Sequence, residues 1–308
     1  MKTSNHKKLS LVLLGVFVVI LFSVQGAMGK GECENPETLT FAIVPTADLP
    51  TLGKMYDPVL KHISNVTGKK IDFYMPTSYG SVAEAMLRGW VDFARLGPFA
   101  YTIAHERSKG NVKVFGSRLR IKGIFEGAGV GYHCILITKK GSGLETVKDL
   151  KKKVLALVDP ASTSGSLVPE VLFSGQKLGG TPLKKYFGKV FYSGGHDLSV
   201  LAVVEGRADA AFVAAPQVDR AIDRKLLREK DIHEIWRSIF IPQDAYAYKQ
   251  TLCPELKKKI EKAWLTMHEY EPARPFLDFL KCVKYVPMKD SDYDVIRELA
   301  EAKAKKKK

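Results

Sequence analysis

A short strand, a loop of hydroxyl side chains and a helix follow one another between residues 155 and 173, and this succession constrains the fold more than any other stretch. The apolar run Leu155–Val158 is typical of a buried strand. After the loop, apolar residues recur at helical spacing, at Leu167, Val168, Val171 and Leu172. Between strand and helix, Ser162, Thr163 and Ser164 offer neutral hydroxyl groups beside the positive end of a helix dipole. The stretch therefore predicts an anion site, with plain helix capping as the alternative.

The same succession recurs in the first half of the chain. A strand is predicted over residues 39–44, and the loop after it contains Thr46. A second strand at 70–74 leads to a loop with Tyr79, and a third strand at 91–95 follows the next helix. This β-α-β-α-β order predicts a mainly parallel sheet, with a ligand crevice at the carboxyl ends of its strands.

Two long strands are predicted in the middle of the chain, at 112–121 and 131–138, and we interpret them as a connecting ribbon. The alternation of strand and helix resumes from residue 147, and residues 236–248 return the chain to the first half. A length of 308 residues accommodates two domains of ordinary size. The pattern predicts the α/β fold of a two-lobed periplasmic binding protein (type II), with a mainly parallel sheet flanked by helices in each lobe and a two-strand hinge.

The predicted bounds follow from this pattern. They are 1–29 for a signal peptide, 37–128 for the first part of lobe 1, 129–238 for lobe 2, 239–300 for the return segment and C-terminal helices of lobe 1, and 301–308 for a lysine-rich tail.

The N-terminus has the layout of a secretory signal. Lysines at 2, 7 and 8 precede an apolar run from Leu9 to Phe22, and small and polar residues follow as far as Gly29. The apolar run is short for a membrane span. We therefore expect export to a periplasmic or other extracytoplasmic location, with a retained membrane tether as the alternative.

Four cysteines in an exported chain permit two disulfides in three pairings. The sequence does not choose among Cys33, Cys134, Cys253 and Cys282, and the pair to test first is Cys253 with Cys282. Their spacing does not resemble a zinc cluster, and Cys134 lies in an apolar segment that predicts a buried small side chain. No metal and no cofactor is predicted.

The formal net charge of +15 suits an anionic ligand. Removing residues 1–29, which contain three lysines and no acidic residue, still leaves +12. Much of this charge lies in runs such as Lys151–Lys153 and Lys257–Lys259, which are typical of solvated surfaces. Because the chain has no zinc finger, RNA-recognition signature or basic stretch interleaved with aromatic residues, nucleic acid is not an expected partner.

Four blocks of the sequence resemble the phosphonate-binding family of solute receptors for ABC importers, also described as phosphate/phosphite/phosphonate-binding proteins. The most specific block is the Ser-Thr-Ser-Gly loop at 162–165 with the Leu-Val-Pro start of its helix. The others are Ser78–Gly80 with Val91–Gly97, Gly194–Ala202 and Ile235–Asp244. The similarity covers nearly everything from Leu39 to the final helices, and it implies a receptor whose cleft closes on its ligand.

The resemblance implies that hydroxyl and amide groups hold a tetrahedral phospho-group. By position, Ser162, Thr163 and Ser164 would form the cradle in the second lobe. Tyr79 would donate from the first lobe, joined by Thr46, so that the bound anion bridges the lobes and favours closure.

Two further residues complete the implied site. His196 would donate to the same oxygens, with a polar loop residue as the alternative. Asp244 would accept a hydrogen bond from a protonated ligand oxygen or a ligand amine and would repel a fully deprotonated oxyanion such as sulfate, with a turn residue as the alternative. The places where aminophosphonate binders of the family carry an aromatic residue and an acid correspond to Leu96 and to Ala214–Pro216, which disfavours an aminophosphonate. Arg95 would be a cationic partner if it faced the cleft, but strand alternation allows either face.

The predicted function is capture of phosphate, phosphite or a small phosphonate in an interlobe cleft by a monomer that delivers it to an ABC permease. The alternative is a subunit that presents the bound anion to a membrane sensor kinase. Phosphate-ester hydrolysis is less favoured, because no orienting acid is identified for a Ser164–His196 pair and no P-loop, dinucleotide loop or His-Glu-x-x-His motif is present. No catalytic residue is therefore predicted.

Overall fold

The computed structural model describes residues 33–45, 49–173, 178 and 180–305. The predicted signal segment and Thr46 lie outside these residues. The strands are β1 (Thr38–Ile43), β2 (Lys70–Tyr74), β3 (Phe93–Leu96), β4 (Val112–Arg120), β5 (Gly131–Lys139), β6 (Val154–Leu157), β7 (Lys189–Tyr192), β8 (Ala210–Ala214), β9 (Ile232–Pro242), β10 (Ala245–Lys249) and β11 (Cys282–Pro287).

The α-helices are α1 (Leu49–Thr67), α2 (Tyr79–Leu87), α3 (Pro98–Arg107), α4 (Val168–Leu172), α5 (Leu183–Tyr186), α6 (His196–Val204), α7 (Ala215–Asp223), α8 (Pro254–Leu265), α9 (Arg274–Phe279) and α10 (Asp294–Lys305). A π turn, η2 (Thr163–Leu167), precedes α4. The short 3-10 turns are η1 (Val147–Leu150), η3 (Glu229–Asp231), η4 (Met267–Glu269), η5 (Glu271–Ala273) and η6 (Asp290–Tyr293). Among the residues described, no helix combines the length and apolar character that crossing a membrane requires.

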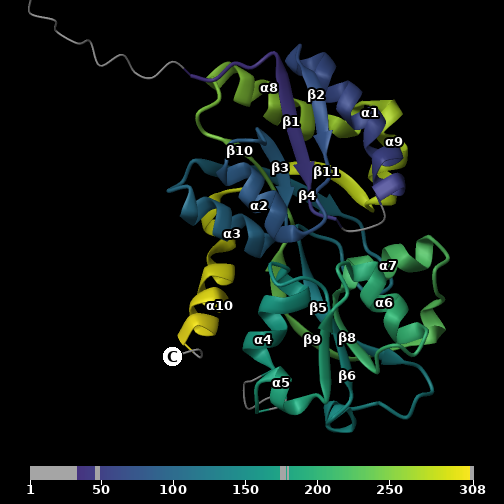
Figure 1. Cartoon of the computed structure of the whole chain (residues 1–308). Helices are drawn as coiled ribbons and strands as arrows, with labels where there is room; N and C mark the ends of the chain where they lie inside the picture. The colour runs from purple at the N-terminus through teal and green to yellow at the C-terminus, as the bar shows by residue number, and fades with distance from the viewer. Residues whose placement is uncertain (1–32, 46–48, 174–177, 179, 306–308) are drawn as a thin grey trace, which may run out of the picture. The chain divides into compact units, whose positions relative to one another are not determined.

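The described strands form two sheets, with helices on both faces of each (Figure 1). The first sheet has the order β11-β4-β10-β3-β1-β2, and the second has the order β7-β6-β8-β5-β9. Both are mixed, so the expectation of a mainly parallel sheet holds for β1–β3 and for β6–β8 but not for the other strands. The antiparallel pairs arise because β4, β5, β9 and β10 carry the chain from one sheet to the other and back.

The two long central strands do not form the predicted ribbon. β4 lies in the first sheet beside β10 and β11, whereas β5 lies in the second sheet beside β8 and β9. In the described chain, residues 121–130 and residues 243–244 are the connections between the strands of the two sheets. The bounds proposed above for the two lobes remain a prediction.

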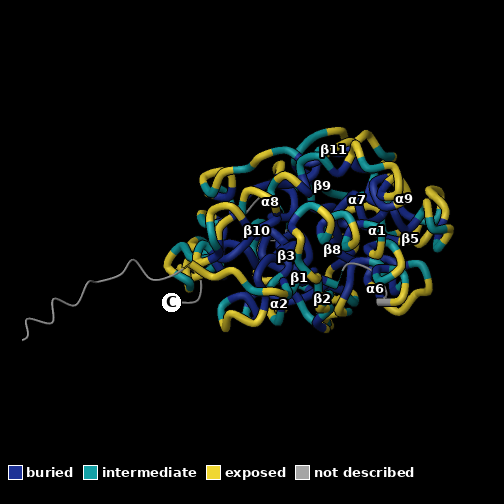
Figure 2. The backbone as a smooth tube through the Cα atoms, turned by 90° about the horizontal axis from the view of Figure 1, so that it is seen from above, coloured by how far each residue is buried: buried dark blue, intermediate teal, exposed yellow. Residues whose placement is uncertain are grey.

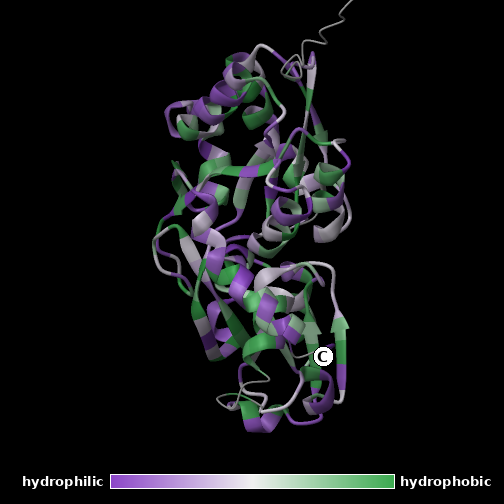
Figure 3. Ribbon diagram, turned by 90° about the vertical axis from the view of Figure 1, so that its left-hand side faces the viewer, coloured by the Kyte–Doolittle hydropathy of each residue, from purple (hydrophilic) through white to green (hydrophobic). Residues whose placement is uncertain are grey.

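Four apolar clusters cover the two faces of the two sheets, as strand alternation requires. In β1, Leu39 and Phe41 pack with α1, α8 and α9, whereas Ala42 packs with α2 and α3. In β6, Leu155 packs with α4 and α10, whereas Ala156 packs with α6 and α7. Buried residues follow the strands in Figure 2, and Figure 3 shows the hydrophobic colour along many of them. Burial of each large apolar side chain contributes about 1.5–3 kcal/mol to folding.

Helix α10 contacts both halves of the described chain. Arg297 forms an ion pair with Glu106 of α3 at 3.3 Å, and Lys303 forms one with Glu170 of α4 at 2.8 Å. The helix continues to Lys305, so much of the predicted lysine-rich tail is helical. Alanine and lysine are strong helix formers, and the Lys303 contact adds to their effect.

The disulfide joins Cys33 to Cys253, which settles a pairing that the sequence left open, and the pair singled out for the first test, Cys253 with Cys282, does not form. A bridge between Glu34 and Leu252 holds the segment before β1 beside the start of α8, which brings the two cysteines together. Cys282 lies in β11, which is the edge strand of the first sheet opposite β2. Cys134 is a buried thiol, as its apolar surroundings predict.

Candidate functional site

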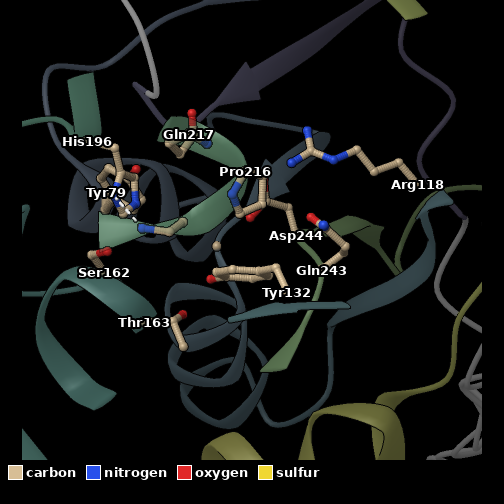
Figure 4. A pocket seen from close by; sticks show the side chains of 12 residues that line it. Tyr79, Arg118, Tyr132, Ser162, Thr163, His196, Pro216, Gln217, Gln243 and Asp244 are labelled. Atoms are coloured by element: carbon tan, nitrogen blue, oxygen red, sulfur yellow. Dashed lines mark hydrogen bonds between the residues drawn. The ribbon is translucent and has the colours of Figure 1, made fainter. Parts of the chain in front are cut away.

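Five helical segments of the described chain begin around one cavity. The first residues of α2 and α6, and the cap residues of α3, η2 and α7, all contribute to its wall. Helix N-termini present unpaired N–H groups and the positive end of the helix dipole. The lining residues, drawn in Figure 4, are Tyr79, Gly97, Arg118, Tyr132, Ser162, Thr163, His196, Ala214, Pro216, Gln217, Gln243 and Asp244. The arrangement suits an anion.

The hydroxyl loop supplies two of the three predicted serine and threonine side chains. Ser162 Oγ accepts a hydrogen bond from the Gly165 N–H at 3.1 Å, so this residue is also a helix cap. Thr163 Oγ1 accepts one from the Phe99 N–H at 2.9 Å. Because both oxygens act as acceptors in these bonds, their hydroxyl hydrogens remain available for a ligand.

Ser164 does not line the cavity. Its side chain is fully buried, and its carbonyl oxygen accepts a contact from the Cys134 thiol at 3.1 Å. Successive side chains of a helical turn point in different directions, so three consecutive hydroxyls do not all face one ligand. The structure therefore brings Ser162 and Thr163 to the cavity and leaves Ser164 behind its wall.

Tyr79 brings a buried phenol to the cavity from the start of α2. Its oxygen has no hydrogen-bond partner within the described ranges. Burial raises the pKa of Tyr79 well above its usual value, and the neighbouring Asp244 raises it further. The phenol therefore stays protonated and is available as a donor.

His196 is a neutral donor rather than a charged one. Its Nδ1 accepts a hydrogen bond from the Ala214 N–H at 3.2 Å, the contact dashed in Figure 4, so the ring hydrogen belongs on Nε2. Burial lowers the pKa of His196 to about 3, and the positive charge of Arg220 contributes.

This histidine predicts a specific dependence of stability on pH. Between about pH 3 and 6.5 the unfolded chain binds a proton at residue 196 and the folded chain does not, so stability falls as the pH falls. The slope is about 1.4 kcal/mol per pH unit. Unfolding by denaturant between pH 7 and 4 should therefore show a smaller loss of stability in His196→Gln than in the natural protein. Equal losses would show that His196 is not held neutral.

Asp244 lies in the short connection between β9 and β10 and is paired from behind. Its Oδ2 is 3.2 Å from Nε of Arg95, which is fully buried. Arg95 also donates from Nη1 to the Tyr56 hydroxyl at 3.1 Å. The sequence left open which face of its strand Arg95 takes. Its side chain lies behind Asp244, where it supports the carboxylate at the cavity wall.

Two hydrogen bonds beside the cavity connect the half of the structure built on the first sheet to the half built on the second sheet. One is the bond from the Phe99 N–H to Thr163, and the other runs from the Tyr79 N–H to Asp159 Oδ2 at 3.3 Å. Both link the loop after β6 to the start of a helix that covers the first sheet. The site is therefore shared by the two halves.

The chain matches the model of a family described as the periplasmic substrate-binding protein of a phosphonate ABC transporter, over residues 41–293. The chain belongs to this family. Members of the phosphonate-binding family are extracytoplasmic components of ABC transporters, with a small-molecule ligand and a membrane permease as partners.

Two curated relatives cover most of the chain. The Phosphate-import protein PhnD of Mycolicibacterium smegmatis is 30% identical over 333 residues, which span 100% of this chain and 99% of the relative. The Phosphonates-binding periplasmic protein of Escherichia coli is 26% identical over 286 residues, which span 91% of this chain and 81% of the relative.

Solved structures confirm the two-lobed type II fold of this phosphonate-binding family member. The binding protein component of an ABC phosphonate transporter from Pseudomonas aeruginosa has a TM-score of 0.78 at 24% identity, covering 88% of this chain and 87% of that one. PhnD1 of Prochlorococcus marinus, solved with methylphosphonate, has a TM-score of 0.73 at 17% identity, covering 87% and 98%.

Four lining residues were not predicted from the sequence: Arg118, Tyr132, Gln217 and Gln243. Arg118 and Tyr132 lie on β4 and β5, where no motif marks them. The two glutamines adjoin segments that were singled out, since Gln217 follows Ala214–Pro216 and Gln243 precedes Asp244. Within the residues described, no group of three histidine, cysteine or acidic side chains is placed to hold a metal ion.

Proposed function

We propose that this protein captures phosphate, phosphite or a small phosphonate in the cavity and delivers it to the permease of an ABC importer. The observation that carries the proposal is the convergence of five helix starts and a set of neutral donors on one small space. Each helix N-terminus favours a nearby negative charge by about 0.3–1 kcal/mol. The names of the two curated relatives, one for phosphate import and one for phosphonates, agree with this ligand class.

Asp244 provides the discrimination, as the one carboxylate among the described residues that line the cavity. Tyr79, Ser162, Thr163 and His196 donate hydrogen bonds to ligand oxygens, and Asp244 is the acceptor for a protonated oxygen. Phosphate and phosphonate monoanions carry such a proton near neutral pH. Sulfate does not, so it would place an unshared negative charge against Asp244.

Ligand binding and closure are coupled in this proposal. An anion that contacts Tyr79 from the first half and Thr163 from the second binds the closed arrangement more tightly than an open one. The hydrogen bonds from Phe99 to Thr163 and from Tyr79 to Asp159 stabilise the same closed arrangement. A permease that engages the closed form would then receive only loaded protein.

We propose binding without catalysis. Nδ1 of His196 is occupied by a backbone N–H, and a pKa of about 3 makes its ring a poor base at neutral pH. Neither Ser162 nor Thr163 hydrogen-bonds to a base in the described residues. We also propose that residues 1–29 direct export and that the protein acts as a monomer.

Loss of the two cavity hydroxyls tests the proposed ligand contacts. Ser162→Ala and Thr163→Val should each weaken phosphate or methylphosphonate binding by about 1–3 kcal/mol, because each removes a charge-assisted hydrogen bond. Calorimetric titration of protein stripped of endogenous ligand measures the effect. Ser166→Ala is the matched control, since this buried hydroxyl lies one turn away and bonds to Glu170 outside the cavity. Affinities unchanged in both variants would remove the hydroxyl loop from the site.

A further inference from the structure

Arg118 is a buried charge that forms no ion pair with a described carboxylate. Its side chain projects from β4 to the cavity wall, and the residue is only 3% exposed. Its Nε and Nη1 atoms are buried and make no hydrogen bond, and no carboxylate of the described chain forms an ion pair with it. Because arginine stays protonated in proteins, the described residues leave this positive charge without an ion-pair partner of its own.

Two buried acidic groups of the described chain are paired with other arginines. Asp244 pairs with Arg95 at 3.2 Å, and Asp219 pairs with Arg120 at 3.6 Å. Arg118 also lies close enough to Arg120 for the two positive charges to repel each other. Burial is the main cause that lowers the pKa of Arg120 to about 10, and the positive charge of Arg118 is the second. Among the residues that the structure describes, these two carboxylates therefore pair with other arginines rather than with Arg118.

An isolated buried ion costs several kcal/mol, so an unpaired guanidinium at a ligand cavity indicates that the ligand supplies the counter-charge. Figure 4 shows Arg118 reaching the cavity from the side opposite His196 and Ser162. The ring of Tyr132 and the ring of Pro216 lie between these two ends. Gln243 and Asp244 are drawn there as well, so the cavity has one end suited to a phospho-group, a middle lined by both apolar and polar side chains, and a second, cationic end.

We propose that the ligand carries a second anionic group, which Arg118 binds as a specificity-determining residue. The substrate class is a phosphonate whose short carbon substituent ends in an acidic group such as a carboxylate. This inference rests on the proposed function, which places the phospho-group against Ser162 and Thr163. An ammonium substituent would instead meet the positive charge of Arg118.

Calorimetric titration of the ligand-stripped protein with phosphonoacetate, methylphosphonate and 2-aminoethylphosphonate tests the proposal. The natural protein should bind phosphonoacetate most tightly. Arg118→Gln should lose about 30-fold or more in affinity for phosphonoacetate and less than about 5-fold for methylphosphonate. Without ligand this variant should be at least as stable as the natural protein, because it removes an uncompensated buried charge. His196→Gln is the control, since it should weaken all three ligands by a similar factor.

The outcomes separate the inference from the proposed function. If methylphosphonate or 2-aminoethylphosphonate binds the natural protein as tightly as phosphonoacetate, the inference is overturned and the proposed function stands. If Arg118→Gln weakens all three ligands equally, Arg118 has no selective role and the inference again fails. If no phosphorus compound binds, the proposed function itself is wrong. Should Arg118→Gln not fold, the ligand order of the natural protein decides alone.

Discussion

Gly165→Ala is expected to lower the free energy of unfolding by about 3 kcal/mol and to abolish tight anion binding. A Cβ atom at this position would lie 2.3 Å from Cβ and Cγ2 of Val158 and 2.9 Å from Oγ of Ser162. Real Cβ atoms do not approach so closely, so the π turn would have to move away from β6. That movement would break the bond from the Gly165 N–H to Ser162 and displace the hydroxyl loop.

Gly80→Ala is the matched control for this substitution. Gly80 also lies in the first turn of a helix at the site, but a Cβ there would meet nothing within 4 Å. Because alanine favours helix over glycine, Gly80→Ala should leave stability equal or slightly raised. Denaturant unfolding with calorimetric titration measures both effects. If Gly165→Ala matched Gly80→Ala in stability and affinity, the close packing of the loop on β6 would be refuted.

Asp244→Asn is expected to cost about 3 kcal/mol of stability and to weaken the discrimination against sulfate. The substitution keeps the shape of the side chain but removes the negative charge 3.2 Å from Nε of the fully buried Arg95. It also replaces the carboxylate that repels a fully deprotonated oxyanion by an amide that donates to it. The preference for phosphate over sulfate should fall by about 100-fold, which corresponds to about 2.7 kcal/mol.

A double-mutant cycle separates the ion pair from other effects of the substitution. Arg95→Met and Asp244→Asn together should destabilise by less than the sum of the single changes, with a coupling of at least about 1 kcal/mol. Additive changes would show that the two side chains do not stabilise each other. Sulfate discrimination that survives in Asp244→Asn would show that the carboxylate does not select the ligand.

Much of what lines the cavity could be anticipated from the sequence, partly from local patterns and partly from the resemblance to the phosphonate-binding family, whereas the binding roles of these residues stay predictions. A strand followed by a hydroxyl loop and a helix places its loop at the carboxyl end of the strand, and Ser162, Thr163, Tyr79 and His196 all lie there around one cavity. Asp244 also lines this cavity. These residues adjoin helix starts or a short connection, where backbone geometry follows from nearby residues.

Features that depend on distant contacts could not be predicted in the same way. Arg118 lies in a strand whose place between β11 and β10 is set by residues more than a hundred positions away. The pairing of Cys33 with Cys253 likewise depends on contact between two segments that lie 220 positions apart in the sequence. The orientation of Ser164 depends on the rotation of a π turn, which a run of three hydroxyl residues does not reveal.

The central claim is that the cavity binds a phosphorus oxyanion in preference to sulfate. Calorimetric titration of the ligand-stripped protein with phosphate, phosphite, methylphosphonate, phosphonoacetate and sulfate tests it most directly. The account predicts tight binding of at least one phosphorus oxyanion, with sulfate at least about 100-fold weaker because of Asp244. Binding of sulfate as tightly as any phosphorus compound, or no binding by any of the five, would contradict it.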